Sequence, residues 1–184
     1  MKYFLFCSLV VCMMGCSSVE PIVKRSPTAK QSNFIVWTED LRSNFQKNSY
    51  NIVLKMRDRS IPGICVLKKN GDKWLGTLIN EMGATIFDFT ITDDKCELSN
   101  VFFIMDKWYI KKTIAADLYF LFNVDNLKAT FQKRLERFEQ DGIKVANYQK
   151  RQIIVKSDSV FMINRQRILQ YELTKLIDIE SDNK

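Results

Sequence analysis

Residues 64–91 read ICVLKKNGDKWLGTLINEMGATIFDFTI, three segments of alternating side chains separated by two tight turns. Asn70-Gly71 is the strongest short signal for a β-hairpin, because glycine readily adopts the positive φ that such turns need. Glu81-Met82-Gly83 supplies the second turn. The flanking residues repeat with the period of two that is typical of half-buried strands. This stretch therefore predicts an antiparallel meander.

The meander extends beyond these residues on both sides. Arg59-Ser60-Ile61-Pro62-Gly63 is interpreted as a break after the first strand, and Asp93-Asp94-Lys95 as the turn before the last. About five strands are predicted at hairpin spacing. They are Tyr50–Met56, Ile64–Lys69, Lys73–Asn80, Ala84–Thr92 and Cys96–Ile104.

Helical spacing appears before and after the meander. Phe34–Lys47 predicts a short helix, and Lys107–Asn123 predicts an amphipathic helix with Asp106 in a capping position. Asp125–Asp141 fits a helix ended by Gly142, although some of its apolar residues also alternate as in a strand; helix is the preferred interpretation. Further strands are predicted at Gln152–Lys156, Ser159–Asn164, Ile168–Leu173 and Lys175–Ile179.

The N-terminus has the pattern of an exported protein. Met1-Lys2 is followed by an apolar run to Met14 that is shorter than the roughly 20 residues of a membrane span. A basic start, a short apolar run and a small residue predict a signal peptide over residues 1–15. Met13-Met14-Gly15-Cys16 resembles the lipobox of bacterial lipoproteins, which implies cleavage before Cys16 and lipid attachment to it. The alternative is an ordinary signal peptide with a chance cysteine.

The remaining chain divides into a tether and one domain. Residues 16–32 are rich in Ser, Pro and Lys and predict a flexible tether, residues 33–180 form one domain, and 181–184 are a polar tail. Ser17 after the lipidated cysteine fits an outer-membrane address, with the domain facing the periplasm. The whole chain carries a net charge of +7. That excess favours contact with anionic lipid headgroups over nucleic acid, or it is simply a solvated basic surface.

The two cysteines of the predicted domain are Cys65 and Cys96. Exported proteins can hold disulfides, and buried free thiols are also common in strands, so both states are open.

Catalysis has little support, because the chain has no histidine and therefore no histidine-based triad. No C-x-x-C spacing occurs, which argues against a zinc site. No cofactor is predicted.

Three motifs carry a resemblance to a known family. They are residues 74–83 (WLGTLINEMG), Phe87-Asp88-Phe89, and Asp106-Lys107-Trp108-Tyr109. With the lipidated cysteine and the order of elements, they resemble LolB-like lipoproteins of the LolA/LolB superfamily of outer-membrane lipoprotein carriers and receptors. The resemblance implies an α+β fold, in which a curved antiparallel half-barrel sheet of about eight to ten strands has helices covering its concave face.

The resemblance also implies an acyl-chain cavity between sheet and helices. Such a cavity is dry and lined by aromatic and aliphatic side chains. The candidate lining residues are Trp74, Leu78, Phe87, Phe89, Tyr109, Ile114 and Leu118. Taken singly, each is more readily interpreted as an ordinary core residue; lipid binding is favoured only by the set as a whole. Met82 is the nearest candidate for the exposed apolar loop residue with which the receptors of that family deliver cargo to the bilayer.

Two functions are consistent with these features. The first is an outer-membrane lipoprotein that binds acyl chains of lipoproteins or other lipids and assists their localisation, with a periplasmic carrier protein as a partner. The second is a non-enzymatic accessory lipoprotein that docks an envelope protein complex. Bound lipid in the purified protein separates the two.

Overall fold

The computed structural model describes residues 22–36, 47–57 and 59–176. Its helices are α1 (Trp108–Asn123) and the single-turn α2 (Ala129–Gln132). Its strands are β1 (Lys30–Gln31), β2 (Lys47–Met56), β3 (Arg59–Asn70), β4 (Lys73–Asn80), β5 (Thr85–Ile91), β6 (Cys96–Ser99), β7 (Glu136–Gln140), β8 (Ile143–Tyr148), β9 (Arg151–Lys156), β10 (Ser159–Asn164) and β11 (Leu169–Lys175).

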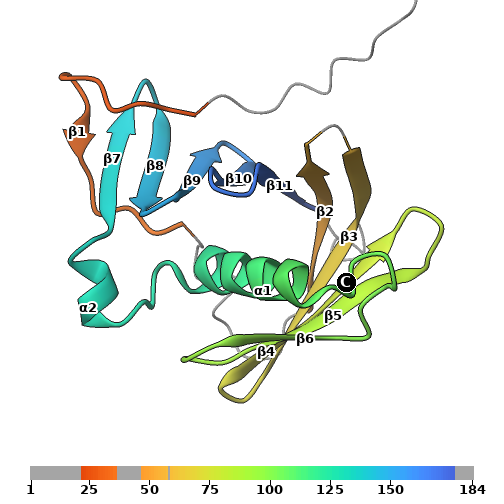
Figure 1. The fold of residues 1–184 in the computed structure, drawn as a ribbon. Coiled ribbons are helices and arrows are strands. Elements are labelled where there is room, and N and C mark those ends of the chain that lie inside the picture. The colour runs from red at the N-terminus through yellow and green to blue at the C-terminus, as the bar shows by residue number, and fades with distance from the viewer. Residues whose placement is uncertain (1–21, 37–46, 58, 177–184) are drawn as a thin grey trace, which may run out of the picture.

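All of these strands belong to one open antiparallel sheet of 11 strands, in the order β1-β7-β8-β9-β10-β11-β2-β3-β4-β5-β6. The pairing of β11 with β2 places Tyr171 opposite Leu54 and joins the meander β2–β6 to the C-terminal strands. The sheet bends strongly, and α1 lies inside the bend, between β4–β6 and the C-terminal strands (Figure 1). One hydrophobic core forms along this inner face. Ile114, Leu118 and Leu121 of α1 are buried in it.

The predicted α+β fold with helices over a half-barrel was wrong. The described part of the chain is mostly antiparallel sheet, with one helix longer than a single turn. The five strands of the meander formed, but the turn between β3 and β4 is Gly71-Asp72, because Asn70 still pairs with Lys73. The last strand, expected to reach Ile104, ends at Ser99. The sheet is also larger than predicted, because residues assigned to a second helix or to no element became β7 and β8.

The error over residues 125–141 comes from the pair Asp141-Gly142. Both residues have positive φ, 53° and 75°, so they form the tight turn of the β7–β8 hairpin. The sequence predicts Gly142 as the end of a helix, a position that also needs positive φ. Asp-Gly is as strong a hairpin signal as Asn-Gly. In the structure only α2 is helical in this segment, and β7 follows with Phe138 buried.

The break predicted at residues 59–63 was also misplaced. β3 begins at Arg59, and Pro62 lies opposite Val53 within the β2–β3 pair. The chain turns instead at Arg57, which has a φ of 55°. Gly63 permits a close approach of β4, because a Cβ there would lie 2.2 Å from the carbonyl oxygen of Ile79.

Residues 22–32, expected to belong to the tether, contact the sheet: Lys30–Gln31 add β1 to its edge beside β7, and Val23 lies on its outer face. The Val23 backbone N–H donates to Gln152 Oε1 at 2.9 Å, and Gln152 Nε2 donates back to the Val23 carbonyl at 2.8 Å. Val23 also packs against a small outer cluster of Ile154, Phe161 and Ile163. This segment is therefore held to β9 at its start.

Several predictions near the two ends of the chain fall on residues outside the described ranges. The signal peptide, Cys16 and most of the helix expected at Phe34–Lys47 are among them, as is the end of the strand expected at Lys175–Ile179. The helix expected at Lys107–Asn123 formed as α1. Its N-cap is Lys107, without a side-chain cap. Asp106 instead forms an ion pair with Lys111 at 2.5 Å.

Candidate functional site

Five of the seven candidate acyl-chain residues lie in the main core. Leu78, Phe87, Phe89, Ile114 and Leu118 are all buried there. The ring of Phe89 packs directly on the backbone of β4, since a Cβ added at Gly76 would lie 2.1 Å from that ring. Its other face stacks on Phe122 of α1, with ring centroids 5.9 Å apart. These side chains therefore contact one another across the interface of sheet and helix.

The other two candidates lie apart from this group. Trp74 is half-buried and packs against the edge of the core, with the Lys69 amine 5.8 Å from its ring centroid. Tyr109 is 48% exposed at the start of α1. The structure does not bring all seven residues together around one space.

An open groove runs beside α1. The residues that line it come from α1 itself, from the β5–β6 turn and from the region of α2, β8 and β9. We call it the α1 groove, with a volume of about 550 Å³. Its lining residues are Asp94, Lys95, Cys96, Lys112, Ala115, Ala116, Tyr119, Phe120, Leu127, Phe131, Tyr148, Gln149 and Arg151. That volume falls within the range usual for small-molecule sites.

One wall of the α1 groove is aromatic. Phe120 stacks on Tyr148 with ring centroids 5.6 Å apart, and Phe131 meets the same tyrosine at 5.8 Å. Phe131 is 37% exposed. The three rings come from α1, β8 and the α2 turn, so tertiary packing alone assembles them.

The side of the groove formed by α1 includes two small residues between larger ones. Ala115 and Ala116 present only methyl groups where longer side chains would fill the space. Lys112 lies one turn before Ala116 on the same helix and is exposed. The groove thus combines apolar and aromatic side chains with three cations, Lys95, Lys112 and Arg151, and one carboxylate, Asp94. The excess of cations suits an amphiphile with an acidic headgroup.

The turn between β5 and β6 is tied to α1 and closes the groove on another side. Tyr119 Oη donates to the Asp93 carbonyl at 2.7 Å, and Asn123 Nδ2 donates to the Thr92 carbonyl at 3.1 Å. Lys128 pairs with Asp94 at 2.5 Å. The hydrogen bond from Lys128 lowers the pKa of the Asp94 carboxyl.

A buried polar cluster underlies the groove and was missed by the sequence analysis. Asp117 of α1 is fully buried and accepts hydrogen bonds from Arg151 Nε at 2.7 Å, Asn164 Nδ2 at 2.8 Å and Tyr171 Oη at 3.3 Å. Burial raises the pKa of the Asp117 carboxyl, although Arg151 and Asn164 oppose that shift. The cluster fixes α1 to β9, β10 and β11, and Arg151 extends from it to the groove.

A signal for this cluster was present in the sequence. Asp117 lies three residues after Ile114 and four before Leu121, on the apolar stripe of the predicted helix. A carboxylate on such a stripe needs buried partners. No comparable local pattern marks the groove, whose wall residues are far apart along the chain.

A second surface feature comprises the connection from β6 to α1 and the first two residues of α1. Large apolar side chains are exposed in the segment 102–109, which we call the aromatic segment. They are Phe102, Phe103, Ile104, Trp108 and Tyr109. Met82, in the neighbouring β4–β5 turn, is 94% exposed.

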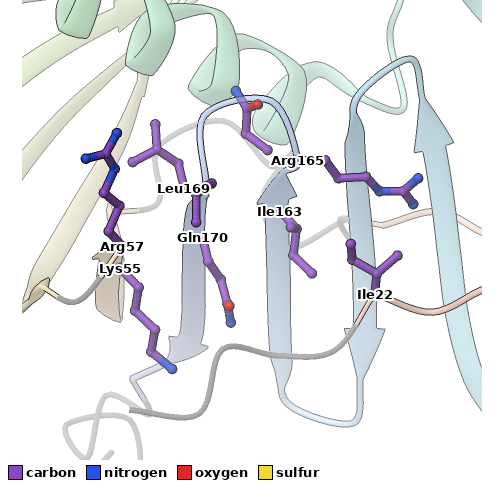
Figure 2. Close-up of a pocket in the computed structure, with 9 residues that line it drawn as sticks. Ile22, Lys55, Arg57, Ile163, Arg165, Leu169 and Gln170 are labelled. Atoms are coloured by element: carbon purple, nitrogen blue, oxygen red, sulfur yellow. The ribbon is translucent and has the colours of Figure 1, made fainter. Parts of the chain in front are cut away.

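A smaller pocket of about 190 Å³ lies on the outer face of the sheet. Figure 2 shows Ile163 and Leu169 beside it, with Ile22 from the N-terminal segment. The charged ends of Arg57, Lys55 and Arg165 point in different directions and do not converge on one point (Figure 2). This pocket therefore lacks a shared binding centre for an anion.

The thiol and metal chemistry of the described residues is simple. Cys65 and Cys96 are both free, so the disulfide left open by the sequence is not formed. No group of three or more His, Cys, Asp or Glu residues that could hold a metal occurs within the described ranges. Among the described helices, none is long and apolar enough to cross a membrane.

Comparison with protein-family models and with curated proteins found no match to this sequence.

Proposed function

We propose that this chain is a lipid-anchored, non-enzymatic protein that binds the acyl chains of lipoproteins or other lipids and assists their localisation to the outer membrane. The α1 groove is the proposed binding site. The observation that carries this proposal is the aromatic wall of Phe120, Tyr148 and Phe131, which lines the same groove as the small side chains of Ala115 and Ala116.

The physical basis is the burial of hydrocarbon. Each methylene removed from water contributes about 0.8 kcal/mol. A groove of about 550 Å³ with apolar walls can therefore hold part of an acyl chain with useful affinity. Lys112 at its edge would attract a carboxylate or phosphate headgroup.

The sequence supplies the membrane attachment in this proposal. A lipid on Cys16, followed by Ser17, would keep the domain at the outer membrane, facing the periplasm. Multiple acyl chains on one cysteine suffice for stable anchoring. The absence of histidine from the chain supports a binding role over an enzymatic one.

The experiment fills the groove and measures lipid binding. Ala116 is exposed and lines the groove, so Ala116→Trp adds a large ring to the space without opening the core. Binding of a fluorescent fatty acid is measured by titration. We expect at least a tenfold loss of affinity in this variant.

Ala84→Trp is the matched control, because Ala84 is exposed in the β4–β5 turn and does not line the groove. It should bind the probe as the unmodified chain does. Equal affinity in all three proteins, or no binding by the unmodified chain, would reject the α1 groove as an acyl site.

The packing of the core favours a second candidate function. Leu78, Phe87 and Phe89 fill the space in which a cavity had been expected. An accessory lipoprotein that docks an envelope protein complex needs a solid core and an exposed contact surface. Lipid-free protein that co-purifies with a stable protein partner would support this second function instead.

A further inference from the structure

We propose that the aromatic segment is a membrane-contact surface that rests on a bilayer containing anionic lipids. The segment faces outward in a fixed conformation. The Phe102 N–H donates to the Ile86 carbonyl at 2.7 Å, which attaches the segment to the start of β5. Met105 is buried, and its N–H donates to the Phe102 carbonyl at 2.8 Å, so the turn is anchored from within.

This anchoring exposes large rings that water solvates poorly. Phe103 is 73% exposed and Trp108 is 74% exposed. Phe102 and Phe103 lie with ring centroids 4.6 Å apart, and Trp108 and Tyr109 lie 6.1 Å apart. Two pairs of exposed aromatic rings within eight residues of the chain indicate a contact surface, unlike scattered single residues.

The residue types favour a bilayer interface as the occupant. Tryptophan and tyrosine concentrate at the headgroup level, where one end of the ring is apolar and the other is wet. Lys107 precedes Trp108, and Lys111 and Lys112 follow Tyr109 on the first turns of α1. Of these three lysines, Lys111 forms an ion pair with the nearby Asp106. Lysines near an anionic lipid surface are attracted to it electrostatically.

The position of the surface also suits the proposed function, although the membrane contact does not depend on it. Lys112 follows the aromatic segment and lines the α1 groove. Contact through the segment would bring the groove entrance close to the lipid surface.

Fluorescence quenching by brominated lipids tests the contact in the full chain reconstituted in vesicles. The sequence contains three tryptophans, including Trp74 at the edge of the core and Trp108 in the segment. We expect brominated phosphatidylglycerol vesicles to quench the unmodified chain. Trp108→Phe should lose most of that quenching, and Trp74→Phe should retain it.

Equal quenching of the unmodified chain and Trp108→Phe would overturn the proposal, and so would a preference of the segment for a protein partner over vesicles. Quenching of the same size in uncharged phosphatidylcholine would overturn the requirement for anionic lipid. Quenching of Trp108 measures membrane contact, whereas the titration of Ala116→Trp measures fatty-acid binding. Failure of the membrane contact is therefore distinguishable from failure of the acyl groove.

Discussion

Asp117 of α1 and Arg151 of β9 form a buried ion pair, in which Arg151 Nε donates to Asp117 Oδ1 at 2.7 Å. The aspartate side chain is fully buried, while that of the arginine retains 20% exposure. The pair lies directly beneath the α1 groove. It therefore connects the stability of the fold with the position of the groove-lining helix.

Removal of the carboxylate should destabilise the protein strongly. Asp117→Ala leaves Arg151, Asn164 and Tyr171 with buried donors that lack their acceptor. Breaking a buried pair in this way costs about 3–5 kcal/mol, and the partial exposure of Arg151 favours the lower end. Urea unfolding followed by circular dichroism measures the loss. Asp94→Ala, which breaks an exposed pair, should leave the midpoint nearly unchanged; similar losses in both variants would contradict this account.

The same residue predicts a pH dependence of stability. Burial raises the pKa of Asp117 above 3.8 in the folded protein, so the folded state binds this proton more tightly than the unfolded chain does. The stability that this proton adds is fully present below the pKa of Asp117 in the unfolded chain. It is lost as the pH rises through the pKa of Asp117 in the folded protein. The stability of the unmodified protein relative to Asp117→Asn should therefore be greater at about pH 4 than at about pH 7. A difference that stays constant with pH would show that Asp117 does not titrate as described.

Gly76→Ala tests the packing of the core beneath the aromatic strand β5. A Cβ at this position would lie 2.1 Å from the Phe89 ring, so the ring must move. Overpacking of this kind costs about 1–3 kcal/mol. The substitution should cost much less in a Phe89→Leu background, where the ring is absent. Additive losses in the double variant would mean that the two residues do not oppose each other.

The two domain thiols should react slowly in the folded protein. Burial raises the pKa of Cys65 to about 12, and burial together with Glu97 raises that of Cys96 to about 12. Thiolates are the reactive species, so alkylation near neutral pH should be slow until the chain unfolds. Iodoacetamide labelling followed by peptide mass mapping measures this for each cysteine. Recovery of a disulfide-linked Cys65–Cys96 peptide would contradict the free thiols of the structure.

The sequence predicted the meander because its turns are local signals. Asn70-Gly71 is a local hairpin signal, and the structure turns there at Gly71-Asp72, with positive φ at Gly71. The alternation in β4 and β5 is a second local signal. Asp141-Gly142 carries the same signal, but the apolar residues around it also fit a helix. The local pattern does not decide between a helix and a hairpin there. The pairing of β7 with β8, which depends on the rest of the sheet, selects the hairpin.

The candidate site was less predictable than the fold. Leu78 and Phe89 have the residue types of a lipid cavity, and those are also the types of a packed core. The α1 groove depends on where Ala116, Phe131 and Tyr148 meet, which spacing along the chain does not reveal. Asp117 was the exception, because a carboxylate on an apolar helix stripe points to buried partners.

Photo-cross-linking most directly tests the proposal that the α1 groove holds an acyl chain. A fatty acid with a photoreactive group at its terminal end is bound to the purified full chain, irradiated and mapped by peptide mass spectrometry. The account predicts cross-links to α1 between Lys112 and Phe120 and to Phe131 or Tyr148, all suppressed in Ala116→Trp. Cross-links confined to the outer pocket at Ile163 and Leu169, or unchanged in that variant, would contradict it.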